Sequence, residues 1–255
     1  MIGLVTWHQG RCGSSVLGSL LNQHSRVQAQ NEIFSRYMPR RWGNKPVPPM
    51  QEVLQSAVRG SQKPVLNIEV KCLAAQNLAL YPKATFRDWL NTTADHGFKR
   101  HLLIHRRNGL RRLVSHLMAQ RTGIYVQQEE AQPRELTDRQ LTIDVELIRE
   151  GVETHSLLGW LERYEQTHQH CRDGLRQWCC ERQQPPPLEL VYEEVIEPSP
   201  LLAYGHVCAA LELEPEPVQV RLKRINPEPL RQLIGNWAEV EALLTTTRFA
   251  WMLAA

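Results

Sequence analysis

Short apolar runs and longer stretches with helical periodicity alternate along most of this chain. The apolar runs predict strands, because a strand buried on both faces needs no alternation of polar and apolar residues. The predicted strands are Ile2 to Trp7, Val65 to Val70, Lys99 to His105 and Leu188 to Tyr192. Helices are predicted at Ser14 to Gln23, Gln51 to Arg59, Cys72 to Leu80, Phe86 to His96, Leu110 to Arg121 and Leu201 to Leu211. This alternation predicts an α/β fold in which helices flank a mainly parallel central sheet.

Four further segments are less regular. The prolines between Met38 and Met50 predict a loop, and Pro215 to Pro229 predicts another, before terminal helices. The segment Asp144 to Glu181 has apolar positions near helical spacing and is predicted to be helical, with Gly174 as a candidate break and Pro185 to Pro187 as its end. The Gln- and Glu-rich segment Gly123 to Asp138 is the best candidate for a mobile loop. No repeat interrupts residues 1–255, so we expect one domain.

The first strand leads through a glycine turn into the first helix, as Gln9-Gly10-Arg11-Cys12-Gly13-Ser14-Ser15. The N–H groups at a helix start and the positive end of the helix dipole both attract an anion. Hydroxyl donors at Ser14 and Ser15 and a guanidinium at Arg11 strengthen that attraction. The segment therefore predicts a phosphate site, although Ser15 is also explained as a helix N-cap. The lysine of the common GxxxxGK[ST] nucleotide loop is absent, which argues against an ordinary ATP or GTP hydrolase.

A second segment has the same order of elements: the strand to His105, a basic turn, and a helix that carries Ser115. Arg107 lies eight residues before Ser115, a little over two helical turns. The basic turn and one face of the helix can therefore bind the same phosphate. The other explanation is a solvated basic helix.

Together the two segments resemble the sulfotransferases that use 3′-phosphoadenosine 5′-phosphosulfate (PAPS). Arg11 to Ser15 is similar to that family's 5′-phosphosulfate loop, and Arg107 with Ser115 is similar to its 3′-phosphate motif. Further similar stretches follow in the family's order: His24 to Val27 with Asn31 to Phe34, Val191 to Val195, and Leu230 to Leu253. The resemblance implies a three-layer, P-loop-like fold.

The resemblance also implies roles. PAPS would be bound by Arg11, Cys12, Gly13, Ser14, Ser15, Arg107 and Ser115, with Arg11 stabilising the leaving phosphate and with no metal. Glu32 stands in a Glu-x-Phe setting that supplies the general base in bacterial members acting on sugars. His8 and His105 are alternative bases at strand ends. Lys71 is a candidate for binding the acceptor or the sulfate, and otherwise a surface lysine beyond a strand end.

Composition narrows the partners and the compartment. A net charge of +3 over 255 residues argues against nucleic acid as a general partner. The cations do cluster, at Arg36, Arg40, Arg41 and Lys45 and again from Arg106 to Arg112, which suits an anionic ligand. The sequence contains no stretch of about 20 apolar residues, so no membrane span is predicted. The six cysteines show no C-x-x-C or zinc spacing and fit reduced thiols in a cytoplasm.

Three hypotheses remain. The first is a PAPS-dependent sulfotransferase acting on a hydroxyl of a carbohydrate, lipid or small metabolite. The second is a P-loop-like kinase for a nucleotide or small molecule, for which Glu193 or Glu194 would have to supply the magnesium ligand. The third is a non-catalytic nucleotide-binding relative. The acceptor and the oligomeric state are not encoded in any short motif.

Overall fold

The computed structural model describes residues 1–73, 76–126, 140–150 and 153–254. The chain divides into two compact units. Unit 1 consists of Met1–His105 and Thr167–Val220, and unit 2 of Arg106–Gln166 and Arg221–Ala255. Each unit has a buried core of its own. The expectation of a single domain stays a prediction.

Unit 1 is built on a five-stranded sheet with the order β2-β3-β1-β4-β7. The strands are β1 (Ile2–His8), β2 (Val27–Ala29), β3 (Val65–Lys71), β4 (Phe98–His105) and β7 (Leu188–Val191), and every neighbouring pair is parallel. This confirms the predicted α/β fold with a parallel central sheet. His8 pairs in register with Lys71, so the chain leaves β1 and β3 at the same edge of the sheet.

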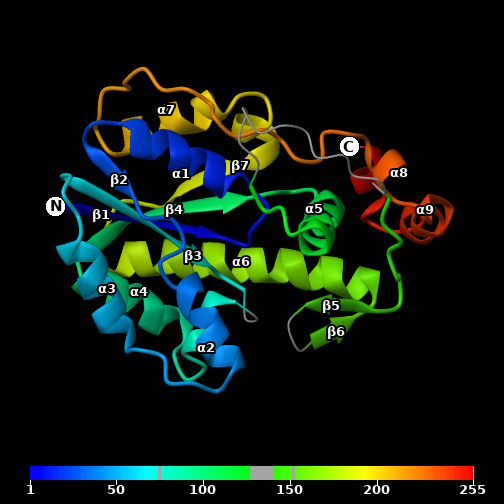
Figure 1. Ribbon diagram of the computed structural model, residues 1–255, viewed down its shortest axis with the longest axis horizontal. Helices are drawn as coiled ribbons and strands as arrows, with labels where there is room; N and C mark the ends of the chain where they lie inside the picture. Colours follow the sequence, from blue (N-terminus) through cyan, green and yellow to red (C-terminus); the bar gives the residue numbers. More distant parts are fainter. Residues whose placement is uncertain (74–75, 127–139, 151–152, 255) are drawn as a thin grey trace. The chain divides into compact units, whose positions relative to one another are not determined.

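Helices cover both faces of this sheet (Figure 1). On one face, α1 (Ser14–Gln23) and α7 (Pro200–Ala210) pack on Leu4 of β1 and Leu102 of β4. On the other, α3 (Met50–Arg59), α4 (Phe86–Asp95) and the Thr167–Glu181 part of α6 (Leu157–Glu181) pack on Val5 and Trp7. Because successive β1 side chains point to opposite faces, this one strand anchors both helical layers.

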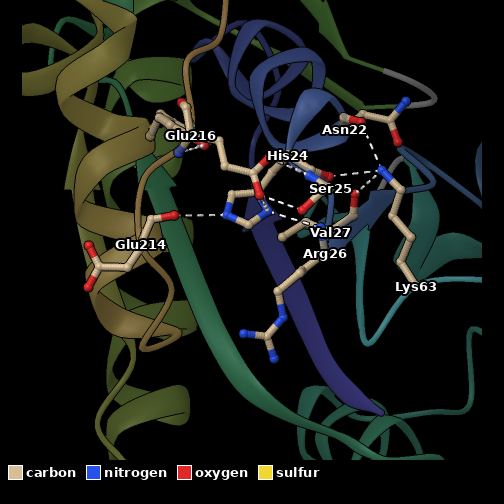
Figure 2. Close-up of polar contacts among 9 residues, drawn as sticks. Asn22, His24, Ser25, Arg26, Val27, Lys63, Glu214 and Glu216 are labelled. Carbon is tan, nitrogen blue, oxygen red and sulfur yellow. Dashed lines mark hydrogen bonds and ion pairs between the residues drawn. The ribbon is translucent and has the colours of Figure 1, made fainter.

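A polar cluster, drawn in Figure 2, holds the end of α1 against the chain that follows α7. His24, 1% exposed, lies with Nε2 3.1 Å from the Glu214 carbonyl oxygen, and its Nδ1 accepts the Arg26 N–H at 3.0 Å. Lys63 donates to the carbonyl oxygens of Asn22, His24 and Val27 at 3.2, 2.9 and 2.9 Å. These bonds satisfy the last carbonyl groups of α1 and fix the start of β2.

Unit 2 contains α5 (Gly109–Thr122), the antiparallel hairpin β5 (Ile148–Glu150) and β6 (Glu153–His155), the first part of α6, α8 (Leu230–Leu233), α9 (Trp237–Thr245) and the final 3₁₀ turn Ala250–Ala254. Its core surrounds the buried Arg112 guanidinium. That group pairs with Glu150 at 3.2 Å and lies over the rings of Trp160 and Tyr164. A buried charge needs such partners to offset the loss of hydration.

The prediction of a helix from Asp144 is wrong before Leu157, where β5 and β6 form. Trp160 Nε1 donates to Glu150 at 3.1 Å, and Arg112 pairs with the same carboxylate. These long-range contacts fix β5 although its apolar spacing matches a helix. Gly174 does not break α6. A Cβ there would lie 3.0 Å from the Phe86 ring, so this glycine allows close packing.

Two smaller predictions also need correction. The predicted loop from Met38 begins with the short helix α2 (Met38–Trp42), which tolerates Pro39 because a helix start needs no N–H there. The helix predicted from Cys72 to Leu80 is, in its described part, only the 3₁₀ turn Asn77–Leu80. The edge strand β2 was not predicted. Most of the predicted mobile loop, residues 127–139, lies outside the described residues.

None of the helices in the described part of the chain has both the length and the apolar character needed to cross a bilayer.

Candidate functional site

The turn between β1 and α1 holds its backbone in the left-handed region at three residues. Gly10, Arg11 and Gly13 have φ values of 77°, 57° and 85°. Residue 13 must be glycine for two reasons. Its positive φ disfavours other residues, and a Cβ would lie 2.7 Å from Ile196 Cγ2. A left-handed residue followed by a helical one turns successive N–H groups toward the same point, as anion-binding turns do.

The helix that follows begins without a side-chain cap. Gly13 offers no capping group, and the first turn of α1 contains no acidic residue. Ser14 is buried and Ser15 exposed. Cys12 is 1% exposed and its side chain belongs to the core beneath α1, so its thiol is not placed to contact a ligand. This end of α1 therefore suits an oxyanion such as a phosphate.

The structure brings together two residues that were predicted separately, Glu32 and Lys71. Lys71 Nζ lies 2.8 Å from Glu32 Oε1, and the Ser35 hydroxyl donates to Oε2 of the same carboxylate. Burial by itself raises the pKa of Glu32, but Lys71 and Ser35 outweigh it and hold that pKa below its ordinary value of 4.5. Glu32 is therefore a carboxylate at neutral pH, and Lys71 is part of the site rather than a separate surface lysine.

Local backbone bonds fix the position of Glu32. Asn31 has a φ of 43°, a conformation that Asn tolerates better than most residues. Its carbonyl oxygen accepts N–H groups from Ile33 at 3.0 Å and from Glu69 of β3 at 2.8 Å. The carboxylate thus leaves the chain at the edge of the sheet, beside the end of β3.

Asn77, which is fully buried, connects the two halves of the Glu32–Lys71 pair. Its Oδ1 accepts the Lys71 backbone N–H at 2.7 Å, and its Nδ2 donates to Ser35 Oγ at 3.2 Å. No sequence motif pointed to Asn77. A side chain of this kind is found only from the fold, because its partners are 6 and 42 residues away.

His8, 1% exposed, lies between the glycine turn and Glu32. Its Nδ1 accepts the Gly10 N–H at 3.1 Å, an arrangement in which the ring is neutral and its proton is on Nε2. Nε2 lies 3.4 Å from Oε2 of the buried Glu69, outside hydrogen-bonding geometry. Burial alone lowers the pKa of His8, but its contacts with Cys12 and Glu69 raise it to about 10. With this pKa the ring takes up a second proton, on Nδ1, at neutral pH, and that proton replaces the bond from Gly10.

Glu69 was not predicted, although the sequence held a signal for it. Asn67 and Glu69 are polar positions within β3, a strand that the fold buries on both faces. Asn67 is satisfied by the Thr6 hydroxyl, which donates to Oδ1 at 2.8 Å. Oε1 of Glu69 has no hydrogen-bond partner among the described residues. A buried polar atom of this kind is costly and marks a place where a further group belongs.

One atom each from His8, Glu32 and Glu69 lies within 4.8 Å of the others, a donor set that a divalent cation accepts. Two observations oppose a cation there. Gly10 keeps the proton of His8 on the nitrogen that would bind it, and Lys71 already neutralises Glu32. The expectation that no metal takes part stays a prediction.

The second predicted phosphate segment belongs to unit 2. Asn108 caps α5 by accepting the Arg111 N–H at 2.8 Å, Arg107 is exposed in the turn before it, and Ser115 is half-buried in α5. The role of these two residues stays a prediction. His105, the other alternative base, is stacked on His168 of unit 1 with ring centroids 3.6 Å apart, which favours a packing role.

A crystal structure described as a sulfotransferase from Alicyclobacillus acidocaldarius matches this chain with a TM-score of 0.50. The match covers 99% of this chain and 94% of that one. The chain has a sulfotransferase fold. At 15% identity this likeness establishes the fold alone. No family model matches the sequence, and no curated protein matches it.

In this sulfotransferase fold, His8 is hydrogen-bonded to the glycine turn and lies within 4.8 Å of Glu32 at the edge of the sheet. The site contains a place for an oxyanion and a carboxylate that is ionised at neutral pH. Arg11, Gly13, Ser14, Ser15, Glu32 and Lys71 all belong to unit 1.

Proposed function

We propose that this protein is a PAPS-dependent sulfotransferase that moves a sulfuryl group to a hydroxyl of its acceptor. The observation that carries the proposal is the Glu32 carboxylate, held by Lys71 and Ser35 beside an uncapped helix start. The fold and the motif resemblance support it from two independent directions. A kinase would need a lysine that reaches the outer phosphates, and the Ser14-Ser15 pair does not provide one.

The residues of unit 1 fit the 5′-phosphosulfate end of PAPS. The N–H groups of Gly13, Ser14 and Ser15 and the Arg11 guanidinium would hold the 5′-phosphosulfate, and Arg107 and Ser115 are assigned to the 3′-phosphate by the resemblance. When bound, PAPS supplies the sulfuryl group on a phosphate leaving group. The cation of Arg11 and the positive end of α1 then stabilise negative charge on that phosphate.

Glu32 would accept the proton of the acceptor hydroxyl at a carboxylate oxygen. Its lowered pKa keeps the base form populated but also makes it a weaker base. Lys71 offers a charge that can contact either Glu32 or an oxygen of the sulfuryl group. Ser35 and Asn77 hold these two groups in position through hydrogen bonds, which is the contribution that in-line transfer needs most.

The direct test is transfer of label from [³⁵S]PAPS to a panel of hydroxylated acceptors: sugars, phenols, sterols and small alcohols. The proposal expects label in at least one product, with no requirement for added metal. Phosphate transfer from ATP with magnesium, and no transfer from PAPS, would favour the kinase. Binding of PAPS without transfer to any acceptor would favour the non-catalytic nucleotide-binding relative.

A further inference from the structure

A groove of about 530 Å³ opens beside Glu32 in unit 1. It lies between the turn after β2 and helix α3, and the polar side chains of Gln30, Asn31, Glu32, Arg36 and Ser56 line most of it. Amide and hydroxyl groups of this kind suit a ligand rich in hydroxyl groups. Since Glu32 lines the groove, a hydroxyl bound there would lie within reach of the proposed base.

The chain that forms one side of the groove is strongly cationic. Between Ile33 and Gln51 there is no Asp or Glu, while the same segment contains four cations, Arg36, Arg40, Arg41 and Lys45. No carboxylate in the described part of the chain forms an ion pair with any of these four. Charge is therefore concentrated next to Glu32, although the net charge of the whole chain is only +3.

These cations differ in what their side chains contact. Arg41 Nε donates to the Ala79 carbonyl oxygen at 3.1 Å and so has a structural bond. Arg36 and Arg40 are both exposed and lie one helical turn apart, over the same Tyr37 ring at 5.1 and 5.8 Å from its centroid. Stacking on Tyr37 orders the two guanidinium groups at little entropic cost. Only Arg36 of the four also lines the groove.

We propose that the groove binds an acidic sugar as the acceptor, with its anionic group against Arg36 and one of its hydroxyl groups facing Glu32. This inference rests on the proposed function and names its acceptor class. Charge supports it: Lys71 already neutralises Glu32, so the positive charge of Arg36 in the same groove is left for an anionic group of the ligand. A neutral acceptor would need no such cation. A guanidinium matches the two oxygens of a carboxylate or of a sulfate ester.

The experiment compares three acceptors of similar size, methyl β-glucuronide, glucose 6-sulfate and methyl β-glucoside, in wild type and in Arg36→Gln. We expect wild type to prefer a charged acceptor over the neutral one in kcat/KM. Arg36→Gln should raise the KM for the charged acceptor by about tenfold or more, with kcat and the neutral acceptor little changed. The first two acceptors distinguish a carboxylate from a sulfate ester. Arg26→Gln, an exposed arginine of unit 1 outside the groove, is the matched control and should change nothing.

Two further readouts separate this inference from the proposed function. Binding of 3′-phosphoadenosine 5′-phosphate should be the same in wild type and Arg36→Gln; weaker binding would assign Arg36 to the cofactor and overturn the inference. Saturation-transfer NMR with each sugar needs no turnover, and failure of both acidic sugars to bind better than the glucoside would also overturn it. Turnover of neutral acceptors alone would contradict the inference and keep the proposed function. If the wild-type protein neither binds the bisphosphate nor transfers a sulfuryl group to any acceptor, the proposed function is contradicted.

Discussion

His8 and His24 occupy nearly the same local setting and end in different roles. Each is 1% exposed, and each accepts at Nδ1 the N–H of the residue two positions later, at 3.1 and 3.0 Å. His24 Nε2 meets a carbonyl oxygen at 3.1 Å, so the ring is satisfied. His8 Nε2 faces a carboxylate without a hydrogen bond. A satisfied histidine stabilises a fold, whereas an unsatisfied one beside Glu32 indicates a site that is completed by something else.

The largest expected effect belongs to the carboxylate beside His8. Glu32→Gln keeps the shape and removes the proton acceptor, so kcat should fall by about 10²- to 10⁴-fold. Bisphosphate affinity and the melting temperature should stay close to those of wild type. Steady-state kinetics with an acceptor that the wild type sulfates measures the change. An unaltered kcat would show that Glu32 takes no part in the chemistry.

The next effect falls on stability rather than on turnover. His24→Ala leaves the Arg26 N–H and the Glu214 carbonyl oxygen without their partner and opens a cavity. We expect the free energy of unfolding to fall by about 2–4 kcal/mol, with kcat per folded molecule unchanged. Urea denaturation of the purified variant measures the loss. A selective loss of activity in a fully stable variant would contradict the structural role given to His24.

His8→Ala should show the opposite pattern. The substitution removes one good hydrogen bond and one unsatisfied nitrogen, so its cost in stability should be smaller than that of His24→Ala. Because the ring lies between the glycine turn and Glu32, kcat should fall by about tenfold. If both histidine variants lose stability equally and neither loses activity, the comparison between them fails.

The smallest effect is a shift in pH dependence. Lys71 and Ser35 overcome burial to lower the pKa of Glu32, so Lys71→Met should raise that pKa and move the acidic limb of kcat/KM to higher pH. The lowered pKa also affects stability. The ion pair stabilises the folded protein at pH values above 4.5, the ordinary pKa of a glutamate, and this contribution disappears as the pH falls through the lowered pKa. Lys83→Met, an exposed lysine, is the control. An unmoved acidic limb would mean that Lys71 does not set the charge of Glu32.

The same contrast explains what the sequence could predict. The glycine turn, Glu32 and Lys71 were found because they lie in local motifs or directly after apolar runs. The ion pair between Glu32 and Lys71 was not predicted, because the two residues are 39 positions apart in the chain. Glu69 alternates with apolar residues and so resembles the exposed side of a strand. Only the fold shows that α1 covers that side, with a Cβ on Gly18 meeting Glu69 Oε1 at 2.8 Å.

The helix prediction for the segment before Leu157 was wrong for a related reason. Val145 and Ile148 are three positions apart, which suits a helix, but Val145 lies in the loop before β5 and Ile148 in β5 itself, and both side chains are buried in the unit 2 core. Glu150 pairs with Arg112, 38 residues earlier. Hydrophobic spacing reports local periodicity and carries no information on such a partner. Gly174 shows the converse, since a residue that usually weakens a helix is used here to pack against Phe86.

Whether the glycine turn binds the nucleotide of PAPS is tested by a melting titration with 3′-phosphoadenosine 5′-phosphate, run beside ATP with magnesium. At about 100 times its dissociation constant, a ligand adds about 2.7 kcal/mol of stability, which for a chain of this size is a shift of about 5–10 °C. We expect that shift with the bisphosphate, its loss in Arg11→Ala, and no comparable response to ATP. A shift with ATP alone, or with neither nucleotide, would contradict this expectation.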